Sequence, residues 1–288
     1  MPEPNIRAVA KIPKRDVIRV PSGFTTLDAM LGGGIVLPSL GVIPARPNVG
    51  KTRFGLSLLR QLQCPRMFIS MEENAEDVRE MLEAAEGSLT KIMVADLVTT
   101  CDIDSVLESL DFAAKWHMPI VVLDHLQCIE VPRCRPFSYE AASMAIRALQ
   151  KWVKGGGHEP VCLIALAQIG RGVMDKGAYR EPMMEDIKGS GEIEQAADWI
   201  VSLWREEAFK DDSGPVDTRI KLTVLKNRRG LRFVRGYMGF DGAQSRVWDL
   251  PEPEITSLQA RREARAERQA EDSSPGASEA TQWLNDAD

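Results

Sequence analysis

The stretch PARPNVGKT, residues 44–52, is close to a phosphate-binding loop. The common pattern of such loops is GxxxxGK followed by Ser or Thr. Here Gly50, Lys51 and Thr52 match the end of that pattern, but Ala45 stands where its first glycine belongs. The first glycine eases a tight turn between strand and loop, and alanine fits there as long as its φ angle stays negative. The substitution therefore weakens the match without removing a group that contacts phosphate.

The residues around the loop have the pattern that phosphate binding requires. LGVIPA, residues 40–45, is an apolar run that predicts a buried strand, and KTRFGLSLLRQL, residues 51–62, repeats apolar residues at helical spacing. Backbone N–H groups at such a helix start point toward a bound anion. We therefore expect a nucleotide here, with Lys51 on its β- and γ-phosphates and the Thr52 hydroxyl on Mg²⁺. The expected nucleotide-binding residues are Ala45, Arg46, Pro47, Asn48, Val49, Gly50, Lys51, Thr52 and Arg53.

Alternating strand and helix patterns continue along the chain. They predict an α/β fold, in which a mostly parallel twisted sheet is flanked by helices. The expected elements are strands at 66–70, 119–129 and 160–169, helices at 74–87 and 141–154, a short helix running into a strand at 191–205, and a C-terminal β-hairpin of 219–230 and 232–241.

Three polar residues stand where apolar strands end, namely Glu72, Asp124 and Gln168. The carboxyl ends of parallel strands share one edge of the sheet, and open α/β sheets bind ligands at that edge. We expect Asp124 to hold the Mg²⁺ shell through water, Glu72 to orient or deprotonate the attacking water, and Gln168 to sense the γ-phosphate. Glu73, directly after Glu72, is the alternative base, and these residues alone leave both open.

Composition limits the classes of protein and of site. The chain has 288 residues, 44% of them apolar, and no window of the roughly 18 to 20 uninterrupted apolar residues that a membrane span needs. Its N-terminus has no secretory signal, so we expect a cytoplasmic protein without membrane contact. The net charge of −6 argues against nucleic-acid binding over the whole surface, so any such site must be local. The five cysteines form no CxxC pair and the three histidines are scattered, which predicts reduced core thiols and no zinc site.

Six motifs resemble those of the DnaB-type replicative helicases and the related phage primase-helicases. They are ARPNVGKT, FISMEEN, VVLDHLQ, ALAQIGR, DIKGSGEIEQAAD and VLKNRRG, in the order that the family has. The resemblance covers about residues 20 to 249, and alanine is common in that family at the position of Ala45. It implies a RecA-like P-loop core, with ATP and Mg²⁺ bound between the subunits of a homo-oligomeric ring that is usually a hexamer. The resemblance is also what implies Glu72 rather than Glu73 as the base.

The resemblance also implies that a basic pair on a late strand completes the neighbouring subunit's site. Lys226 and Arg228 match that pair, and Arg228 is the expected arginine finger. A guanidinium supplied by the neighbour would stabilise charge on the γ-phosphoryl group and make hydrolysis depend on ring geometry. Arg229 is the alternative finger, and a solvated basic hairpin is the alternative to both.

The segment DIKGSGEIEQ resembles the loop that helicase rings present to single-stranded DNA. The expected DNA-binding residues are Arg133, Arg135, Arg171, Lys188, Gly189 and Gly191. The two glycines permit close approach of the backbone to phosphate, and Lys188 adds a charge. Arg171 belongs to a polar loop whose acids balance its bases, so a ring would gather several weak sites on one strand. Arg133 and Arg135 either line the same channel or are ordinary surface arginines.

We expect the chain to divide into an N-terminal arm (1–20), a RecA-like ATPase domain (21–250) and a charged helix with a disordered acidic tail (251–288). Residues 271–288 carry five acids and no Lys or Arg, a composition typical of disorder. The tail either solubilises the protein or binds a replication partner through TQWL, residues 281–284. The long N-terminal domain of DnaB rings and the primase modules of the phage proteins have no counterpart in these residues, which leaves ring assembly open.

The leading hypothesis is therefore an ATP- and Mg²⁺-dependent enzyme that moves along single-stranded DNA, a replicative DNA helicase of the DnaB-like type. The alternative is a RecA-like nucleotide-dependent assembly or regulatory DNA-binding ATPase in replication or recombination that unwinds nothing. A kinase using the same loop is a third reading, which the sequence disfavours because it shows no lid for a phosphoryl acceptor.

Overall fold

The computed structural model describes residues 16–84, 89–170, 180–187, 189–205, 218–242, 244, 246–251 and 255–256. Most of the expected arm and nearly all of the expected tail lie outside these residues, so the division into three parts stays a prediction. The strands are β1 (Ile18–Val20), β2 (Ile35–Leu37), β3 (Ser39–Ala45), β4 (Arg66–Ser70), β5 (Ile92–Asp96), β6 (Ile120–Asp124), β7 (Cys162–Gln168), β8 (Trp199–Trp204), β9 (Arg219–Asn227), β10 (Arg235–Asp241) and β11 (Arg246–Asp249). The helices are α1 (Thr25–Leu31), α2 (Lys51–Gln61), α3 (Ala75–Glu83), α4 (Ile103–Lys115), α5 (Tyr139–Gly155) and α6 (Ser190–Ala196), with short 3₁₀ turns η2 (Leu126–Cys128) and η4 (Met184–Asp186). No helix of the described part is both long and apolar enough to cross a membrane.

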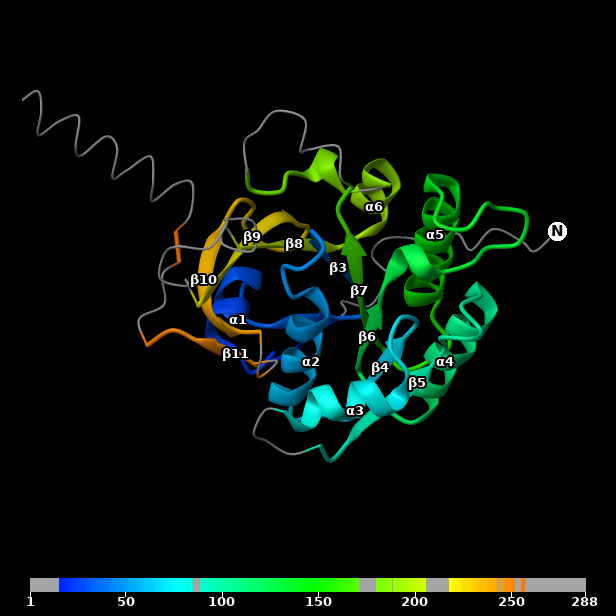
Figure 1. Cartoon of the computed structure of the whole chain (residues 1–288), viewed down its shortest axis with the longest axis horizontal. Coiled ribbons are helices and arrows are strands. Elements are labelled where there is room, and N and C mark those ends of the chain that lie inside the picture. Colours follow the sequence, from blue (N-terminus) through cyan, green and yellow to red (C-terminus); the bar gives the residue numbers. More distant parts are fainter. Residues whose placement is uncertain are drawn as a thin grey trace, which may run out of the picture.

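The main sheet has nine strands in the order β11-β10-β9-β8-β3-β7-β6-β4-β5 (Figure 1). The strands from β8 to β5 in that order run parallel, whereas β9, β10 and β11 are each antiparallel to the strand before them. The mostly parallel sheet and the C-terminal β-hairpin are therefore confirmed. Because parallel strands share their carboxyl ends, one edge of the sheet collects the loops after β3, β4, β6 and β7.

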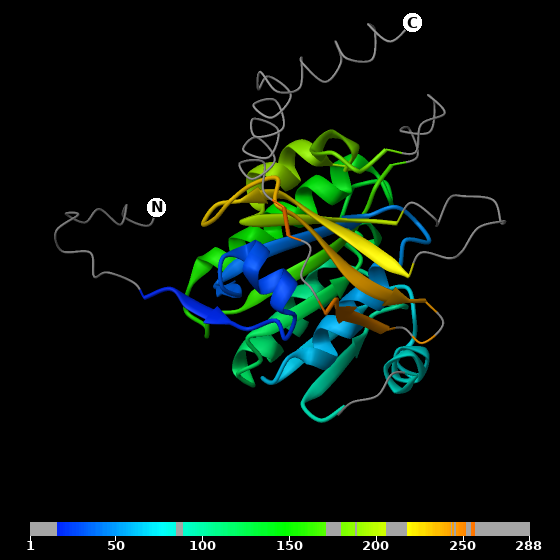
Figure 2. The same ribbon diagram turned by 90° about the vertical axis from the view of Figure 1, so that its left-hand side faces the viewer.

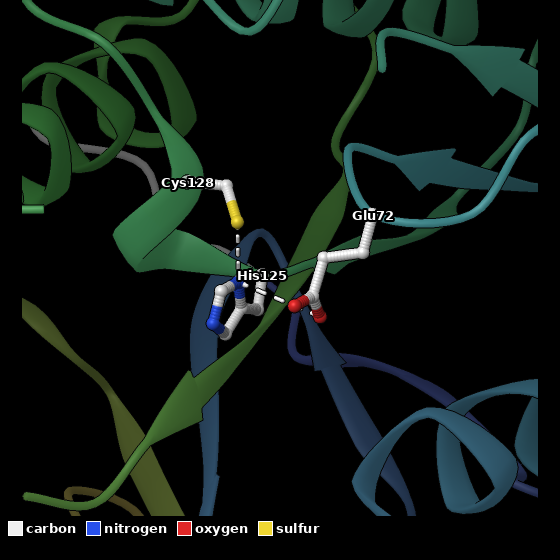
Figure 3. Close-up of side chains that lie close together, drawn as sticks. All are labelled: Glu72, His125 and Cys128. Atoms are coloured by element: carbon white, nitrogen blue, oxygen red, sulfur yellow. Dashed lines mark hydrogen bonds and ion pairs between the residues drawn. The ribbon is translucent and has the colours of Figure 1, made fainter. Parts of the chain in front are cut away.

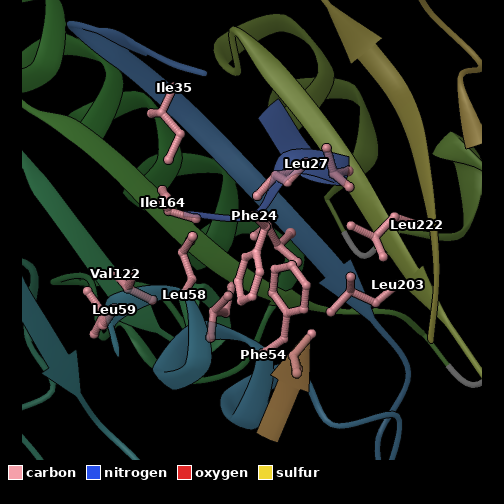
Figure 4. Packing of buried hydrophobic residues seen from close by; sticks show 14 of the residues in the cluster. Phe24, Leu27, Ile35, Phe54, Leu58, Leu59, Val122, Ile164, Leu203 and Leu222 are labelled. Atoms are coloured by element: carbon pink, nitrogen blue, oxygen red, sulfur yellow. The ribbon is translucent and has the colours of Figure 1, made fainter. Parts of the chain in front are cut away.

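Helices cover both faces of the sheet (Figures 1 and 2). Residues of α1, α2 and α3 form the core on one face, and residues of α4, α5 and α6 form the core on the other. In the first core the rings of Phe24 and Phe54 lie 6.4 Å apart, with Leu58 and Ile164 beside them (Figure 4). Fully burying an aliphatic or phenyl side chain contributes about 1.5–3 kcal/mol. Coverage of both faces explains why the central strands read as unbroken apolar runs.

Polar caps mark where two of the expected helices begin, α3 at its expected start and α5 two residues before its expected start. Asn74 Oδ1 accepts the backbone N–H of Asp77 at 2.8 Å at the start of α3. Ser138 Oγ accepts the backbone N–H of Ala141 at 3.1 Å at the start of α5, whose other end is capped by Gly156 at a φ of 71°. A cap of this kind contributes about 1 kcal/mol, so these side chains help to fix both boundaries.

The structure differs from the sequence-based expectation at three places near the expected site. The strand expected at 119–129 stops at Asp124, and the turn η2 follows, so the next residues leave the sheet. α3 ends at Glu83, and Gly87, the expected end, lies outside the described residues. The patterns also missed β5 and α4, although residues 92–95 form a short apolar run and the apolar residues of α4 follow helical spacing.

Candidate nucleotide-binding site

A pocket of about 320 Å³ opens at the carboxyl ends of the parallel strands. It is lined by Ala45, Arg46, Pro47, Asn48, Gly50, Lys51, Thr52, Arg53, Glu72, Glu73, Met81, His125 and Gln168. Eight of the nine loop residues expected to bind a nucleotide are in this lining. The ninth, Val49, has its side chain buried in the core, and its N–H donates to the Arg46 carbonyl at 3.4 Å. The loop, Glu72 and Gln168 therefore surround one cavity.

The two ends of the loop differ in their need for glycine. Ala45 ends β3 without a left-handed φ, and its carbonyl accepts the Ile169 N–H at 3.0 Å. Gly50 has a φ of 100°, and a Cβ there would lie 2.3 Å from Phe240 Cζ. Asn48, at a φ of 66°, is a residue type that tolerates the left-handed region. The backbone therefore accommodates alanine at position 45 and requires glycine at position 50.

Lys51 and Thr52 lie in the first turn of α2 and converge on Asp124, the last residue of β6. Lys51 Nζ is 3.2 Å from Asp124 Oδ1, and the Thr52 hydroxyl donates a hydrogen bond to Asp124 Oδ2. Asp124 is only 1% exposed and is not itself among the residues that line the pocket. Its Oδ1 atom is ion-paired with Lys51 but accepts no hydrogen bond from the described residues. A hydroxyl and a carboxylate oxygen with spare acceptor capacity suit Mg²⁺ or its water shell, so these residues fit the expected ion.

Glu72 follows β4, and 47% of its side chain is exposed at the pocket. Its Oε2 is 3.8 Å from His125 Nδ1, and Cys128 Sγ lies 2.8 Å from the same nitrogen (Figure 3). Burial, followed by the charge of Lys51, lowers the pKa of His125, so its ring is neutral at neutral pH. Burial raises the pKa of the Cys128 thiol to about 12. Glu72 therefore has no cationic partner in this cluster, and Glu73, which also lines the pocket, remains the alternative base.

Gln168 ends β7 and is held by the turn that follows β6. Its backbone N–H donates to Gln127 Oε1 at 2.9 Å, and its carbonyl accepts from Gln127 Nε2 at 3.3 Å. Its side-chain Oε1 lies 3.5 Å from His125 Nε2. These contacts fix the position of Gln168 at the pocket, where it is expected to sense the γ-phosphate.

His125, Gln127 and Cys128 are site residues that the sequence analysis missed. Scattered histidines predicted no cluster of metal-binding side chains, whereas ligand atoms of Glu72, His125 and Cys128 lie within 4.8 Å of one another. The available signal was DHLQC, residues 124–128, in which a histidine and a cysteine three positions apart follow a strand end. In a helical turn this spacing places both side chains on one side.

Lys226 and Arg228 lie at the opposite edge of the sheet. The end of β9 pairs with the start of β8, and the Arg228 N–H donates to the Asp198 carbonyl at 2.9 Å. The Asp198 N–H in turn donates to the carbonyl of Leu40, near the start of β3, at 2.7 Å. From Leu40 to Ala45, where the phosphate loop begins, is about 16 Å along the strand, further than an arginine side chain reaches. The structure therefore does not bring these two residues to the pocket of their own chain.

Both basic side chains contact the C-terminal end of α6. Arg228 donates to the Gln195 carbonyl at 2.6 Å and lies 3.6 Å from the Asp198 carboxylate. Lys226 Nζ donates to the Glu194 carbonyl. Burial, followed by the charge of Arg228, lowers the pKa of Lys226. Positive charge is stabilised at the carbonyl end of a helix, so these contacts hold both side chains against α6.

Two of the six residues expected to bind DNA, Arg171 and Lys188, lie outside the described residues. Gly189 precedes α6 at a φ of 90°, so glycine is favoured there for its backbone conformation. Gly191 lies in the first turn of α6, and a Cβ there would lie 3.8 Å from the hydroxyl oxygen of Tyr139. The two glycines therefore sit where the start of α6 meets the start of α5.

Arg133 and Arg135 are exposed in residues 131–138, the segment that joins η2 to α5. The hydrogen bond that Tyr139 donates to Glu192 ties the start of α5 to α6. The two arginines thus lie on the segment that leads to the same end of the two helices. Whether they contact DNA stays a prediction.

Comparison with known proteins agrees with this arrangement. The family model of the DnaB-like helicase C-terminal domain matches residues 90–243, which include Asp124, Gln168 and Arg228. The replicative DNA helicase DnaC of Bacillus subtilis (strain 168) is 28% identical over 278 residues, which cover 83% of this chain and 60% of the relative. The replicative DNA helicase DnaB of Geobacillus stearothermophilus is 27% identical over 273 residues, which cover 80% of this chain and 58% of the relative. The chain thus spans about three fifths of the length of these relatives.

Solved structures share the fold. One separately solved ATPase domain has a TM-score of 0.68 at 22% identity, covering 80% of this chain and 91% of that domain. The structure of a DnaB-like replicative helicase, described together with its interactions with primase, has a TM-score of 0.67 at 22% identity. The match covers 82% of this chain and 63% of the helicase. The expected RecA-like fold is confirmed by these likenesses. The family model matches just over half of the residues of this chain. The chain therefore belongs to the family of DnaB-like helicase C-terminal domains.

Proposed function

We propose that the protein is an ATP-dependent enzyme that assembles into a ring, moves along single-stranded DNA and unwinds duplex DNA. The observation that carries the proposal is the division of the site. The phosphate loop, Glu72 and Gln168 line one pocket, whereas Arg228 lies at the other edge of the sheet, about 16 Å or more away. With Arg228 as the arginine finger, hydrolysis would depend on a second subunit, because Arg228 does not reach the pocket of its own chain. The relatives are named replicative DNA helicases, and their names supply the process.

The phosphate loop would hold ATP by its phosphates. Lys51 lines the pocket and is paired with Asp124, so phosphate oxygens would take over part of that pairing. Thr52 and Asp124 would hold Mg²⁺, which supplies neutralising charge at the β- and γ-phosphates. The Asp124 oxygen that lacks a hydrogen bond would gain a partner in this arrangement.

Glu72 would activate the attacking water. Its carboxylate is half exposed in the pocket, and the neutral ring of His125 beside it leaves the carboxylate available to accept a proton. A well-placed general base accelerates a reaction by about 10²- to 10⁴-fold. Gln168, fixed by Gln127, would contact the γ-phosphate from the end of the adjacent strand.

Arg228 would complete the pocket of the neighbouring subunit. In its own chain it is bonded to the Gln195 carbonyl and lies near Asp198, so reaching a neighbour requires that it leave α6. α6 overlaps the segment expected to contact DNA, residues 186–195. The nucleotide state of one interface and the position of that segment would therefore be linked through these contacts.

Single-stranded DNA would pass the shared end of α5 and α6. Gly189, Gly191, Arg133 and Arg135 lie at or near that end. Several subunits acting on one strand would raise the affinity through effective concentration. Roles for Arg171 and Lys188 in this contact, and for residues 251–288 in binding a replication partner, remain predictions.

The test is ATP hydrolysis with and without a single-stranded oligonucleotide, together with strand displacement on a forked duplex. We expect DNA to stimulate hydrolysis, ATP to drive displacement, and Lys51→Ala to remove both. Electron-microscope images with an ATP analogue and the oligonucleotide should show rings with DNA inside. DNA-stimulated hydrolysis without strand displacement would support a regulatory ATPase instead. A hydrolysis rate that does not change when single-stranded DNA is added would contradict movement along DNA.

A further inference from the structure

Three different metal-binding atoms meet beside the phosphate loop. The carboxylate of Glu72, Nδ1 of His125 and Sγ of Cys128 lie within 4.8 Å of one another, and all three side chains point into one space (Figure 3). From this cluster we infer a binding site for a thiophilic divalent cation of the Zn²⁺ type, separate from the Mg²⁺ site at Thr52 and Asp124. Within the described residues it is the one group of at least three such side chains.

The ligand set selects against Mg²⁺. Sulfur and imidazole nitrogen are ligands of Zn²⁺ and similar transition metals, whereas Mg²⁺ takes oxygen ligands and keeps several waters. Cys128 supplies the sulfur and His125 the nitrogen. The cluster would therefore take up a Zn²⁺-type ion even when Mg²⁺ is in large excess.

Small movements would bring the three atoms to coordination distance. With Zn–S of about 2.3 Å and Zn–N of about 2.0–2.1 Å, tetrahedral geometry separates the sulfur and nitrogen atoms by about 3.5 Å. Cys128 Sγ is now 2.8 Å from His125 Nδ1, with the thiol proton between them, and Glu72 Oε2 is 3.8 Å from that nitrogen. The metal would take the place of the shared proton, which leaves to solvent as the S–metal bond forms. No oxidation or reduction is involved.

The surrounding residues orient the imidazole for this role. His125 Nε2 lies 3.5 Å from Gln168 Oε1, an acceptor, so a proton on Nε2 leaves the lone pair of Nδ1 facing the cluster. Gln168 is itself held by Gln127 through two hydrogen bonds. Metal-ligating histidines commonly donate their second N–H to such a partner, which fixes both tautomer and ring orientation.

Burial defines both the rigidity of the site and the route into it. His125 and Cys128 are 4% and 8% exposed and are fixed by the turn η2, whereas Glu72 is half exposed at the pocket. The ion would therefore enter from the pocket side, and Glu72 would close over it. Three protein ligands leave the fourth position of a tetrahedral ion open to water.

Occupation of this site would stop hydrolysis without displacing the nucleotide. This consequence rests on the proposed role of Glu72 as general base, because a carboxylate bound to a cation no longer accepts a proton from water. Lys51 and Thr52, which would hold the phosphates and Mg²⁺, are not ligands of the proposed ion. Zn²⁺ is therefore expected to act as a noncompetitive inhibitor at this pocket.

Co²⁺ titration of the full chain in excess Mg²⁺ tests the site without reference to hydrolysis. Wild type should develop the near-ultraviolet thiolate-to-cobalt band, and Cys128→Ser should lose it together with about 100-fold or more in affinity, since second-shell partners alone contribute about 10- to 100-fold. The control is Cys101→Ser, because the Cys101 thiol points at the carbonyl of Leu97, at 3.2 Å. Circular dichroism of each variant shows whether it is folded, and Cys128→Ala provides a second variant that lacks the ligand.

The same proteins then enter an ATPase assay with added Zn²⁺ and a binding assay with a fluorescent nucleotide. Inhibition in wild type and Cys101→Ser, its loss in both Cys128 variants, and unchanged nucleotide binding would support the proposal. Co²⁺ binding without a thiolate band, or a band that survives in Cys128→Ser, would overturn the site. A thiolate band with undiminished hydrolysis would overturn the inhibitory role alone. If wild type has no ATPase activity, the proposed function fails while the cobalt spectrum still decides the site.

Discussion

In the parallel half of the sheet, β3, β4, β6 and β7 end at one edge and bring the phosphate loop, Glu72, Asp124 and Gln168 together. In the antiparallel half, β9 runs the other way and places Arg228 at the opposite edge, against α6. The first set has its partners within the chain, because Lys51 and Thr52 both contact Asp124. The direction of a strand thus separates residues that reach the pocket of their own chain from Arg228, which does not reach it and for which we propose a role at another subunit's pocket.

Replacing Arg228 is the most direct test of the contrast between the two halves of the sheet. Arg228→Ala should lower DNA-stimulated hydrolysis by about 10³-fold or more, the effect of losing an arginine finger, while nucleotide affinity stays unchanged. Steady-state hydrolysis and binding of a fluorescent nucleotide measure the two quantities. Arg232→Ala removes an exposed arginine from the same hairpin and should have little effect. A similar loss in Arg229→Ala alone would assign the finger to Arg229 instead.

Mixing variants tests whether the arginine acts between subunits. Arg228→Ala keeps an intact pocket, and Glu72→Gln keeps an intact Arg228, so a mixed ring contains interfaces that join the two intact parts. We expect the mixture to hydrolyse ATP faster than the sum of the separate variants. Activity that merely adds would contradict action in trans.

Glu72→Gln tests the parallel half of the sheet, since it removes the proposed general base within the chain. Hydrolysis should fall by about 10²- to 10⁴-fold, because glutamine cannot accept the proton, while ATP remains bound. Glu73→Gln is the matched control one residue away and should leave hydrolysis within a few-fold of wild type. A change of that size corresponds to less than about 1.4 kcal/mol in activation free energy, the amount that changes a rate about tenfold. Reversed effects in the two variants would make Glu73 the base.

Strand ends explain why much of the site could be predicted from sequence. An apolar run followed by a polar residue indicates where a parallel strand ends, and Asp124 and Gln168 were found in this way. The loop was found from its own motif, and the backbone at Ala45 and Gly50 agrees with that expectation. In the fold, β5 was missed although residues 92–95 are apolar, since so short a run does not by itself distinguish a strand from a helix or a loop.

The remaining contacts depend on geometry that no local pattern contains. Cys128 and His125 meet Glu72 only because the chain leaves the sheet after β6 and turns in η2. Arg228 was expected from resemblance, but its contact with Gln195 follows from the antiparallel pairing of β9 with β8. Such pairings between distant segments are set by packing of the whole domain.

Asp198 joins the two halves, and its replacement should have a moderate effect. Its carboxylate accepts the Leu40 N–H at 2.8 Å and the Lys154 ammonium at 2.6 Å, and it lies 3.6 Å from Arg228. Asp198→Asn keeps the shape but removes the charge, so we expect a loss of about 1.5–3 kcal/mol in the free energy of unfolding by urea. Lys154→Gln, which alters a half-exposed partner, should cost less than about 1 kcal/mol.

A double-mutant cycle then asks whether Asp198 holds Arg228 in place. Because Asp198 and Arg228 are in contact, Asp198→Asn combined with Arg228→Ala should be less destabilising than the sum of the single changes. Strict additivity would show that Asp198 does not hold Arg228, and would weaken the contrast between the two halves of the sheet.

The smallest effect is expected at Asp249, a charged residue of the antiparallel half that serves its own chain. Phe24 precedes α1 without a side-chain cap, and Asp249 of β11 instead accepts the N–H groups of Thr25 and Thr26 at 2.6 and 3.0 Å. Burial alone would raise the pKa of Asp249, but the hydrogen bonds from Thr26 and Thr25 hold it below its ordinary value. Asp249→Asn should therefore cost about 1 kcal/mol at neutral pH, as the loss of a cap does.

Because the pKa of Asp249 is lower in the folded state, its contribution is present above the ordinary aspartate pKa of about 3.9 and disappears as the pH falls through the folded value. The difference in unfolding free energy between wild type and Asp249→Asn should accordingly be largest at neutral pH and vanish in acid. A difference that stays constant with pH would mean that shape rather than charge at position 249 caps α1, and hydrolysis by the folded variant should match wild type because Asp249 lies in neither the pocket lining nor the basic pair.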